Sequence, residues 1–152
     1  MHVGNYVGLL HASEEQLVDA FLAVADHHRD EPDIESTCHL LASWSRQHLQ
    51  TIKPLIERYN EQKSKEPERL THALFEGTRK GSLALLRDLH DLWLLANEVS
   101  LCWTVLAQAA KALRDTQLQA ACAECSKETE RQIAFLLTRI KQSAPQSLVV
   151  AE

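Results

Sequence analysis

The stretch that decides the fold is residues 32–59, PDIESTCHLLASWSRQHLQTIKPLIERY. Its mostly apolar side chains recur at alternating steps of three and four residues, which places them on one face of an α-helix. The positions on this face are Ile34, Cys38, Leu41, Ser45, His48, Ile52, Leu55 and Tyr59. Pro32 suits the first turn of a helix, and Pro54 predicts a kink because proline cannot donate its backbone hydrogen bond. The stretch therefore predicts one long amphipathic helix.

The same apolar spacing continues on both sides of this helix. We expect a first helix that starts at Ser13 as its N-cap, or earlier from Tyr6, and ends before Asp30. Residues 82–114 and 116–142 are expected to form two more long helices. Only four Gly and four Pro occur among 152 residues, fewer than a sheet protein needs for its turns. The sequence predicts an all-α protein.

The breaks between helices predict how the helices are arranged. Short breaks at 30–32 and 114–116 favour two antiparallel hairpins. The connection at 60–81 is longer, and we expect a short helix within it at 67–76. Such a connection reaches roughly 45–50 Å, enough to cross a helix of about 42 Å. The prediction is an antiparallel four-helix bundle with a ferritin-like crossover, and plain up-down topology stays open because the connection could also fold back.

The length fits one domain, which we expect at 1–142 with a flexible C-terminal tail at 143–152. The formal net charge of −5 argues against nucleic acid as a partner. The most apolar stretch, 92–113, is interrupted by polar and charged residues, which argues against a membrane span. We see no signal peptide, and the four Cys lie inside helical patterns, so we expect a cytoplasmic protein with reduced thiols.

Polar residues interrupt the apolar faces at one level of the predicted bundle. In a hairpin that turns near residue 31, Glu14 faces His48, and in the second hairpin Glu98 faces Gln132. A buried polar group without a partner costs about 1–3 kcal/mol, so these side chains need one another. The expected inner layer consists of Glu14, Ser45, His48, Glu98, Thr129 and Gln132.

This layer resembles the pattern of a metal centre. Two-metal carboxylate bundles take a Glu from each of two helices and Glu-x-x-His from each of the other two. Here three strong ligands remain, Glu14, His48 and Glu98. Glu128, one position off the apolar face, could rotate in as a fourth ligand, although an exposed helix face explains it as well. We leave open a single iron or manganese ion at this layer and a hydrogen-bonded layer that binds no metal.

The opening SEEQL at 13–17, followed by Ala20-Phe21, resembles the Ala-Glu-x-Gln-Leu opening of the YciF-type ferritin-like stress proteins. Further similar segments are His39 with Ser43, Gln47-His48, ALFEG at 73–77, NEV at 97–99 and KALRD at 111–115. The resemblance implies a ferritin-like bundle with a stress-associated, metal-binding role. It also implies metal ligands at Glu14 and Glu98, and at His48 or Glu128. The family's Glu-His-Tyr-Glu on the third helix is absent here, as are the paired carboxylates of its second helix.

Two other groups of residues are candidates for chemistry. His27, His28, Asp30, Glu31, Glu35 and His39 crowd the end of the first hairpin. Glu35 and His39 are one helical turn apart, so they could chelate a transition metal, although an exposed polar turn explains the same residues. Cys122-x-x-Cys125 lies within a helix without a second Cys pair, and we interpret it as two buried thiols.

Two functions follow from these patterns. One is a ferritin-like protein with an incomplete metal site. The other is a non-catalytic interaction or scaffold bundle that binds no metal. Trp44 and Trp93 lie beside the apolar faces and could cover a dimer contact, so we expect a homodimer. No nucleophile–base pair or phosphate-binding loop supports an enzyme, and no substrate is indicated.

Overall fold

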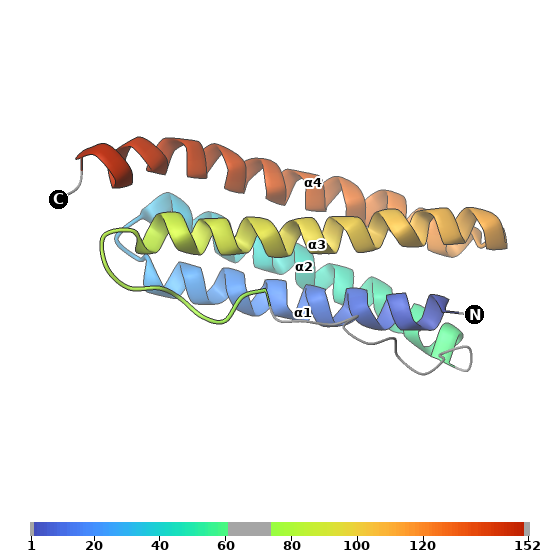
Figure 1. The fold of residues 1–152 in the computed structure, drawn as a ribbon. Helices are drawn as coiled ribbons and strands as arrows, with labels where there is room; N and C mark the ends of the chain where they lie inside the picture. The colour runs from blue at the N-terminus through green and yellow to red at the C-terminus, as the bar shows by residue number, and fades with distance from the viewer. Residues whose placement is uncertain (1, 61–73, 151–152) are drawn as a thin grey trace.

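The structure is a computed structural model that describes residues 2–60 and 74–150. Within these residues it has four long helices, one short π-helical segment and no strand. The long helices pack side by side as a bundle (Figure 1). The prediction of an all-α protein is confirmed.

The first two helices are α1 (Val3–His27) and α2 (Pro32–Tyr59), and the bounds of α2 agree with the prediction. Pro32 is in the first turn of α2, where a missing N–H group costs nothing. Asp33 and Glu35 lie in the same turn, near the positive end of the helix dipole. The helix continues through Pro54, and the expected kink stays a prediction.

Helix α1 begins earlier than we expected. Its first residue is Val3, so both predicted starts, at Ser13 and at Tyr6, are wrong. Ser13 lies in the middle of the helix and is buried, with no capping role. The physical reason is packing: Val7 and Leu10 are almost fully buried, and tertiary burial extends a helix past a local capping signal.

The last two long helices are α3 (Ala84–Leu113) and α4 (Thr116–Pro145). Arg114 between them adopts a left-handed backbone with φ of 54°, and its N–H group bonds back to carbonyls of the last turn of α3. Asp115 is the N-cap of α4, because its carboxylate accepts the N–H group of Leu118 at 3.0 Å. A tight turn therefore joins α3 to α4.

Helical structure extends beyond the predicted end at residue 142. Helix α4 reaches Pro145, and the π-helical segment η2 (Gln146–Val150) follows it. Ser143 is buried, and its Oγ accepts a hydrogen bond from Arg139 at 2.8 Å. This contact stabilises the last turns of α4, so the segment that we expected to be a tail is helical through Val150.

The connection between α2 and α3 is described only from residue 74 onward. Of the short helix expected at 67–76, residues 67–73 lie outside the described residues, and 74–76 are not helical. Figure 1 shows the described part passing beside α1 toward the end of the bundle where α3 begins. Arg79 fixes this segment to α3, since its N–H group bonds to Asp88 and its guanidinium to Asp91.

Figure 1 also shows the course of the chain. Helix α1 leads away from the end of the bundle that holds the N-terminus, and α2 returns toward that end. Helix α3 starts at the opposite end and runs toward the end that holds the N-terminus. Helix α4 then runs back to the end where α3 started. The chain between α2 and α3 therefore joins opposite ends of the bundle.

The core is one continuous cluster of apolar side chains from all four helices. Packing is closest between α1 and α2, between α3 and α4, and between α1 and α3. Helices α2 and α4 approach each other less closely. The largest fully buried side chains include Trp103, Phe21, Leu10, Leu17, Ile34, Ile52 and Leu92. Polar side chains of α2 and α4 meet across this side of the bundle, as the hydrogen bonds of Gln132 and Glu128 to α2 show.

Candidate functional site

The inner polar layer is centred on a contact between α1 and α2. Nδ1 of His48 lies 2.9 Å from Oε1 of Glu14. Glu14 is fully buried, and His48 is 1% exposed. The prediction that Glu14 faces His48 across the first hairpin is confirmed.

The second ring nitrogen of His48 meets a different carboxylate. Nε2 lies 3.1 Å from Oε1 of Glu128 on α4, whose side chain is about one-third exposed. A neutral imidazole carries only one N–H group, whereas the imidazolium carries two. Because both nitrogens face carboxylate oxygens, this geometry favours the protonated ring, which can donate to both.

The charges around His48 act in opposite directions on its pKa. Burial disfavours the charged ring, but the hydrogen bonds and negative charges of Glu14 and Glu128 outweigh that effect. The pKa of His48 is therefore raised above its ordinary value of 6.5. The layer is a carboxylate–imidazolium–carboxylate network.

Trp103 completes this network from α3. Its Nε1–H group donates to Oε1 of Glu14 at 3.2 Å, and its ring is edge-on to that of His48. Trp103 was not among the predicted members of the inner layer. A buried Trp needs an acceptor for its N–H group, and this general requirement was the signal that could have paired it with Glu14.

A second polar pair joins α2 and α4, as the contact between His48 and Glu128 does. The side-chain amide of Gln132 donates to Ser45 Oγ at 2.9 Å and to the carbonyl of Leu41 at 3.0 Å. All of Ser45, Thr129 and Gln132 are fully buried, as the predicted layer requires. Thr129 donates to the carbonyl of Cys125 in its own helix.

Glu98 is set apart from the other candidate ligands. It is half-buried, and its hydrogen-bond contact is with the Cys102 thiol, 3.9 Å away. Within the described residues no hydrogen bond joins Glu98 to Gln132, which bonds to α2 instead. The structure thus brings Glu14 and Glu128 each into contact with His48. Glu98 contacts none of these three side chains in the hydrogen bonds of the described residues.

The donor set of the inner layer does not fit a shared metal ion as it is arranged. Glu14 and Glu128 lie at opposite nitrogens of the His48 ring, so the three side chains do not converge on one point. One observation favours a ligand: Oε2 of Glu14 is buried without a hydrogen-bond partner. A buried carboxylate oxygen normally has a donor or an ion beside it.

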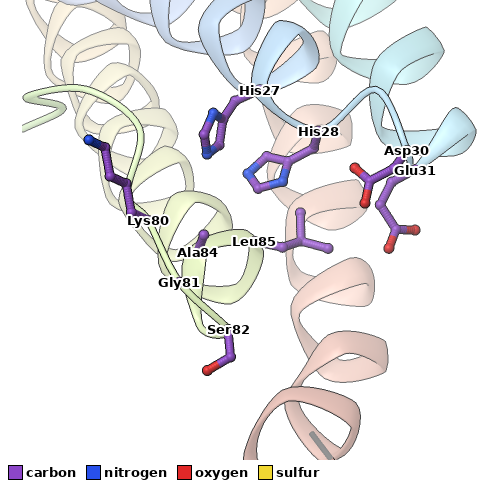
Figure 2. Close-up of a pocket in the computed structure, with 9 residues that line it drawn as sticks. All are labelled: His27, His28, Asp30, Glu31, Lys80, Gly81, Ser82, Ala84 and Leu85. Atoms are coloured by element: carbon purple, nitrogen blue, oxygen red, sulfur yellow. The ribbon is translucent and has the colours of Figure 1, made fainter. Parts of the chain in front are cut away.

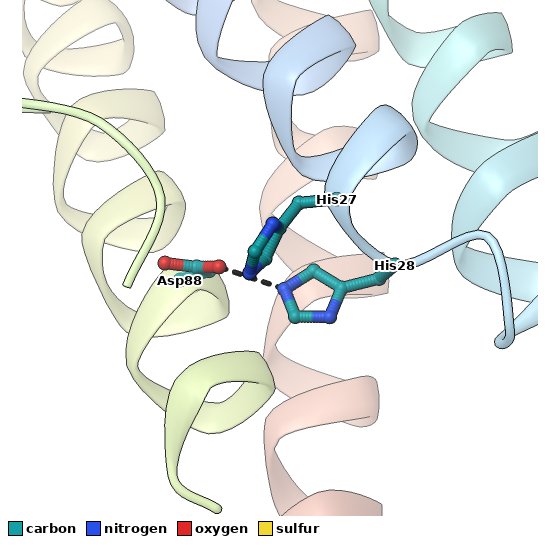
Figure 3. A group of neighbouring side chains, drawn as sticks. All are labelled: His27, His28 and Asp88. Atoms are coloured by element: carbon teal, nitrogen blue, oxygen red, sulfur yellow. Dashed lines mark hydrogen bonds and ion pairs between the residues drawn. The ribbon is translucent and has the colours of Figure 1, made fainter. Parts of the chain in front are cut away.

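A separate cluster lies at the end of the bundle where α1 ends. Nε2 of His28 is 2.7 Å from Oδ2 of Asp88, which is fully buried on α3. Figure 3 shows the ring of His27 beside this pair. One ligand atom from each of His27, His28 and Asp88 lies within 4.8 Å of the others. In residues 2–60 and 74–150 this is the one group of His, Cys, Asp or Glu side chains that converges so closely.

The end cluster borders a solvent-open cavity of about 360 Å³ (Figure 2). Asp30, Glu31 and Lys80 also line this cavity. The sequence predicted both histidines as candidates but gave no indication of Asp88. For the other predicted pair, Glu35 with His39, no hydrogen bond or ion pair joins the two side chains among the described residues.

The four cysteines are all buried and unbridged. Burial raises the thiol pKa of Cys122 to about 11 and that of Cys125 to about 12. Their thiols stay protonated near neutral pH and make poor nucleophiles or metal ligands. This supports our interpretation of Cys122-x-x-Cys125 as buried thiols.

The comparisons identify no relative of this chain. Scans against protein-family models, curated proteins and solved structures found no match. Among the described residues, none of the helices combines the length and the apolar character that a membrane crossing needs.

Proposed function

We propose that this chain is a ferritin-like four-helix bundle that acts as a non-catalytic, homodimeric interaction module. In this proposal a charged hydrogen-bond network occupies the layer where a related bundle holds metal. The observation that carries the proposal is the double contact of His48, whose two ring nitrogens each face a different carboxylate. A ring in that state has no lone pair to give to a metal ion.

The course of the helices supports the ferritin-like assignment. Ferritin-like bundles differ from plain up-down bundles in having one long crossover connection. Here the chain between α2 and α3 joins opposite ends of the bundle (Figure 1). The two short turns at 28–31 and 114–115 support antiparallel hairpins.

Exposed leucines support the homodimer. Leu94 and Leu101 on α3 are 40% and 59% exposed. They are seven residues apart, so they lie on the same side of the helix. Trp44, which we expected to cover a dimer contact, is instead covered within the chain, since the guanidinium of Arg131 lies over its ring. We therefore assign the dimer contact to the exposed side of α3.

A second candidate function is iron or manganese binding at the inner layer, with the stress-associated role that the family resemblance implies. The buried, unpartnered Oε2 of Glu14 favours it. Glu128 is the ligand with freedom to rearrange, because its side chain is partly exposed. In this alternative Glu128 leaves the ring of His48, and the ion takes its place.

Side-chain ¹⁵N NMR of His48 separates the two functions. We expect both ring nitrogens to carry protons at neutral pH, with a pKa above 6.5. In the matched variant Glu14→Gln that pKa falls, since one negative charge is lost. Added Mn²⁺, whose paramagnetism broadens nearby signals, leaves the His48 resonances sharp.

The opposite result is equally clear. A singly protonated ring that broadens at substoichiometric Mn²⁺, with broadening lost in Glu14→Gln, would favour the metal-binding candidate and reject the network. An ion bound at the end cluster would be distant from the His48 ring, because His28 lies 14 residues, or about 21 Å, farther along the chain than Glu14.

A further inference from the structure

His27 and His28 are adjacent in sequence, yet their side chains approach the same point. Neighbouring residues of a helix point about 100° apart and do not face each other. Helix α1 ends at His27, and His28 follows with φ of −119° and ψ of 47°, outside the helical region. The two rings consequently lie edge to face, with centroids 4.8 Å apart (Figure 3).

Asp88 meets the two histidines from α3 and is held in a fixed orientation. Its Oδ1 accepts the N–H group of Arg79 at 2.8 Å, so Oδ2 is the oxygen turned toward His28. The guanidinium of Arg79 is directed to Asp91, at 2.9 Å, and not to Asp88. The buried carboxylate of Asp88 therefore has no side-chain cation from Arg79 to balance it.

The distances suit coordination of one small ion. Transition metals bind imidazole nitrogen and carboxylate oxygen at about 2.0–2.2 Å, which sets neighbouring ligand atoms about 3–3.5 Å apart. The His28–Asp88 pair is at 2.7 Å, and all three ligand atoms lie within 4.8 Å of one another. Small side-chain rotations are enough to place an ion between them.

The adjoining cavity gives such an ion open coordination positions. It has a volume of about 360 Å³, so water or a small anionic ligand can complete the coordination shell. Its charged lining has two carboxylates, Asp30 and Glu31, against the single ammonium of Lys80 (Figure 2). Glu31 is also paired with Arg139 at 3.0 Å. The lining does not repel a cation.

We propose that His27, His28 and Asp88 form a binding site for one divalent transition-metal ion at the end of the bundle. Two imidazoles and one carboxylate are a ligand set that suits zinc and ferrous iron. The site ties the end of α1 to the start of α3. It is independent of the inner layer, since it shares no residue with the His48 network.

Titration with Zn²⁺, followed by calorimetry, tests the site. The wild-type chain is expected to bind one Zn²⁺ saturably. His27→Ala is expected to weaken binding at least about tenfold, as loss of a supporting group already does at other sites. His27 is exposed, so this variant keeps its fold. Asp88→Asn is the second variant and is expected to weaken binding similarly.

Two matched controls complete the experiment. His39→Ala removes another exposed histidine from the same end and is expected to bind Zn²⁺ like wild type. Glu128→Gln, in the inner layer, is also expected to bind like wild type. The proposal is overturned if wild type shows no saturable binding, if His27→Ala binds unchanged, or if His39→Ala loses as much affinity. Loss confined to Glu128→Gln places the ion in the inner layer and rejects the network proposed above as well.

Discussion

His48 is the residue on which the inner layer depends. It is 1% exposed, and its ring contacts the carboxylate of Glu14, which is fully buried. Removing one member of a buried charge pair costs about 3–5 kcal/mol, because the remaining charge is left without compensation. We therefore expect the loss of this side chain to lower the free energy of unfolding strongly.

We predict that His48→Gln lowers the free energy of unfolding by about 3–5 kcal/mol near neutral pH. The control His39→Gln changes an exposed histidine and should shift it by less than about 0.5 kcal/mol. Urea unfolding followed by circular dichroism measures both. Equal effects of the two substitutions would contradict a charged inner layer.

The same residue predicts a pH dependence with a definite sign. The pKa of His48 is raised in the folded state above its ordinary 6.5, so the folded state holds the proton more tightly. Its contribution is fully present below pH 6.5 and is lost as the pH rises through the folded pKa. As the pH rises from 6.5 through the folded pKa, we expect the free energy of unfolding of wild type to fall, and that of His48→Gln to fall less. A wild-type profile parallel to that of the variant would reject the raised pKa.

At this scale the sequence predicted the Glu14–His48 pair, but its second predicted pair, Glu98 with Gln132, does not form a hydrogen bond in the described residues. It also missed the contact between His28 and Asp88. Glu14 and His48 could be matched because a short turn fixes which residues face each other. Asp88 lies three residues after Leu85 and four before Leu92, which is core spacing, but this spacing alone does not identify Asp88 as a site residue. Its contact with His28 depends on how α1 packs against α3, and no local pattern encodes that register.

At the scale of the helix, Asp115 joins three contacts at the α3–α4 turn. It caps α4 through Leu118, and its other oxygen accepts from Arg58 and from the hydroxyl of Tyr59 at the end of α2. Burial acts to raise the pKa of Asp115, but the hydrogen bonds from Tyr59 and Leu118 and the charge of Arg58 lower it below 3.8. One side chain thus starts α4 and ties it to α2.

We predict that Asp115→Ala lowers the free energy of unfolding by about 1–2 kcal/mol through loss of the cap. Asp115→Asn should cost less, because Asn is also a good N-cap. The stability that the charge contributes is present above pH 3.8 and is lost as the pH falls through the folded pKa. Urea unfolding should therefore show wild type and Asp115→Asn converging in acid, and a constant difference would argue against the ionised carboxylate.

The sequence predicted a helix end correctly where a single residue determines it. The prediction was wrong where tertiary packing determines the end. Pro32 and the turn at Asp115 fixed the starts of α2 and α4 as expected. The start of α1 at Val3 and the continuation of α4 to Pro145 depend on burial of apolar side chains and of Ser143. These are tertiary effects, and the capping pattern around Ser13 gave the opposite indication.

For the whole molecule, the exposed side of α3 is the surface that the proposed dimer uses. We predict that light scattering gives twice the chain mass of 17.2 kDa. Leu101→Glu places a charge in the apolar contact and should return the protein to one chain mass. Leu148→Glu alters an equally exposed leucine on η2 and should leave the dimer intact. A single-chain mass for wild type would remove the dimer from the proposed function.

The division of the bundle into two hairpins has a consequence for assembly. Each hairpin is closed by a short turn and has its closest packing within itself, while α1 and α3 form most of the contact between them. The side chains of α1 and α3 therefore supply attraction between the two halves. We expect two separate polypeptides, divided between α2 and α3, to keep the complementary apolar surfaces through which the halves could recombine.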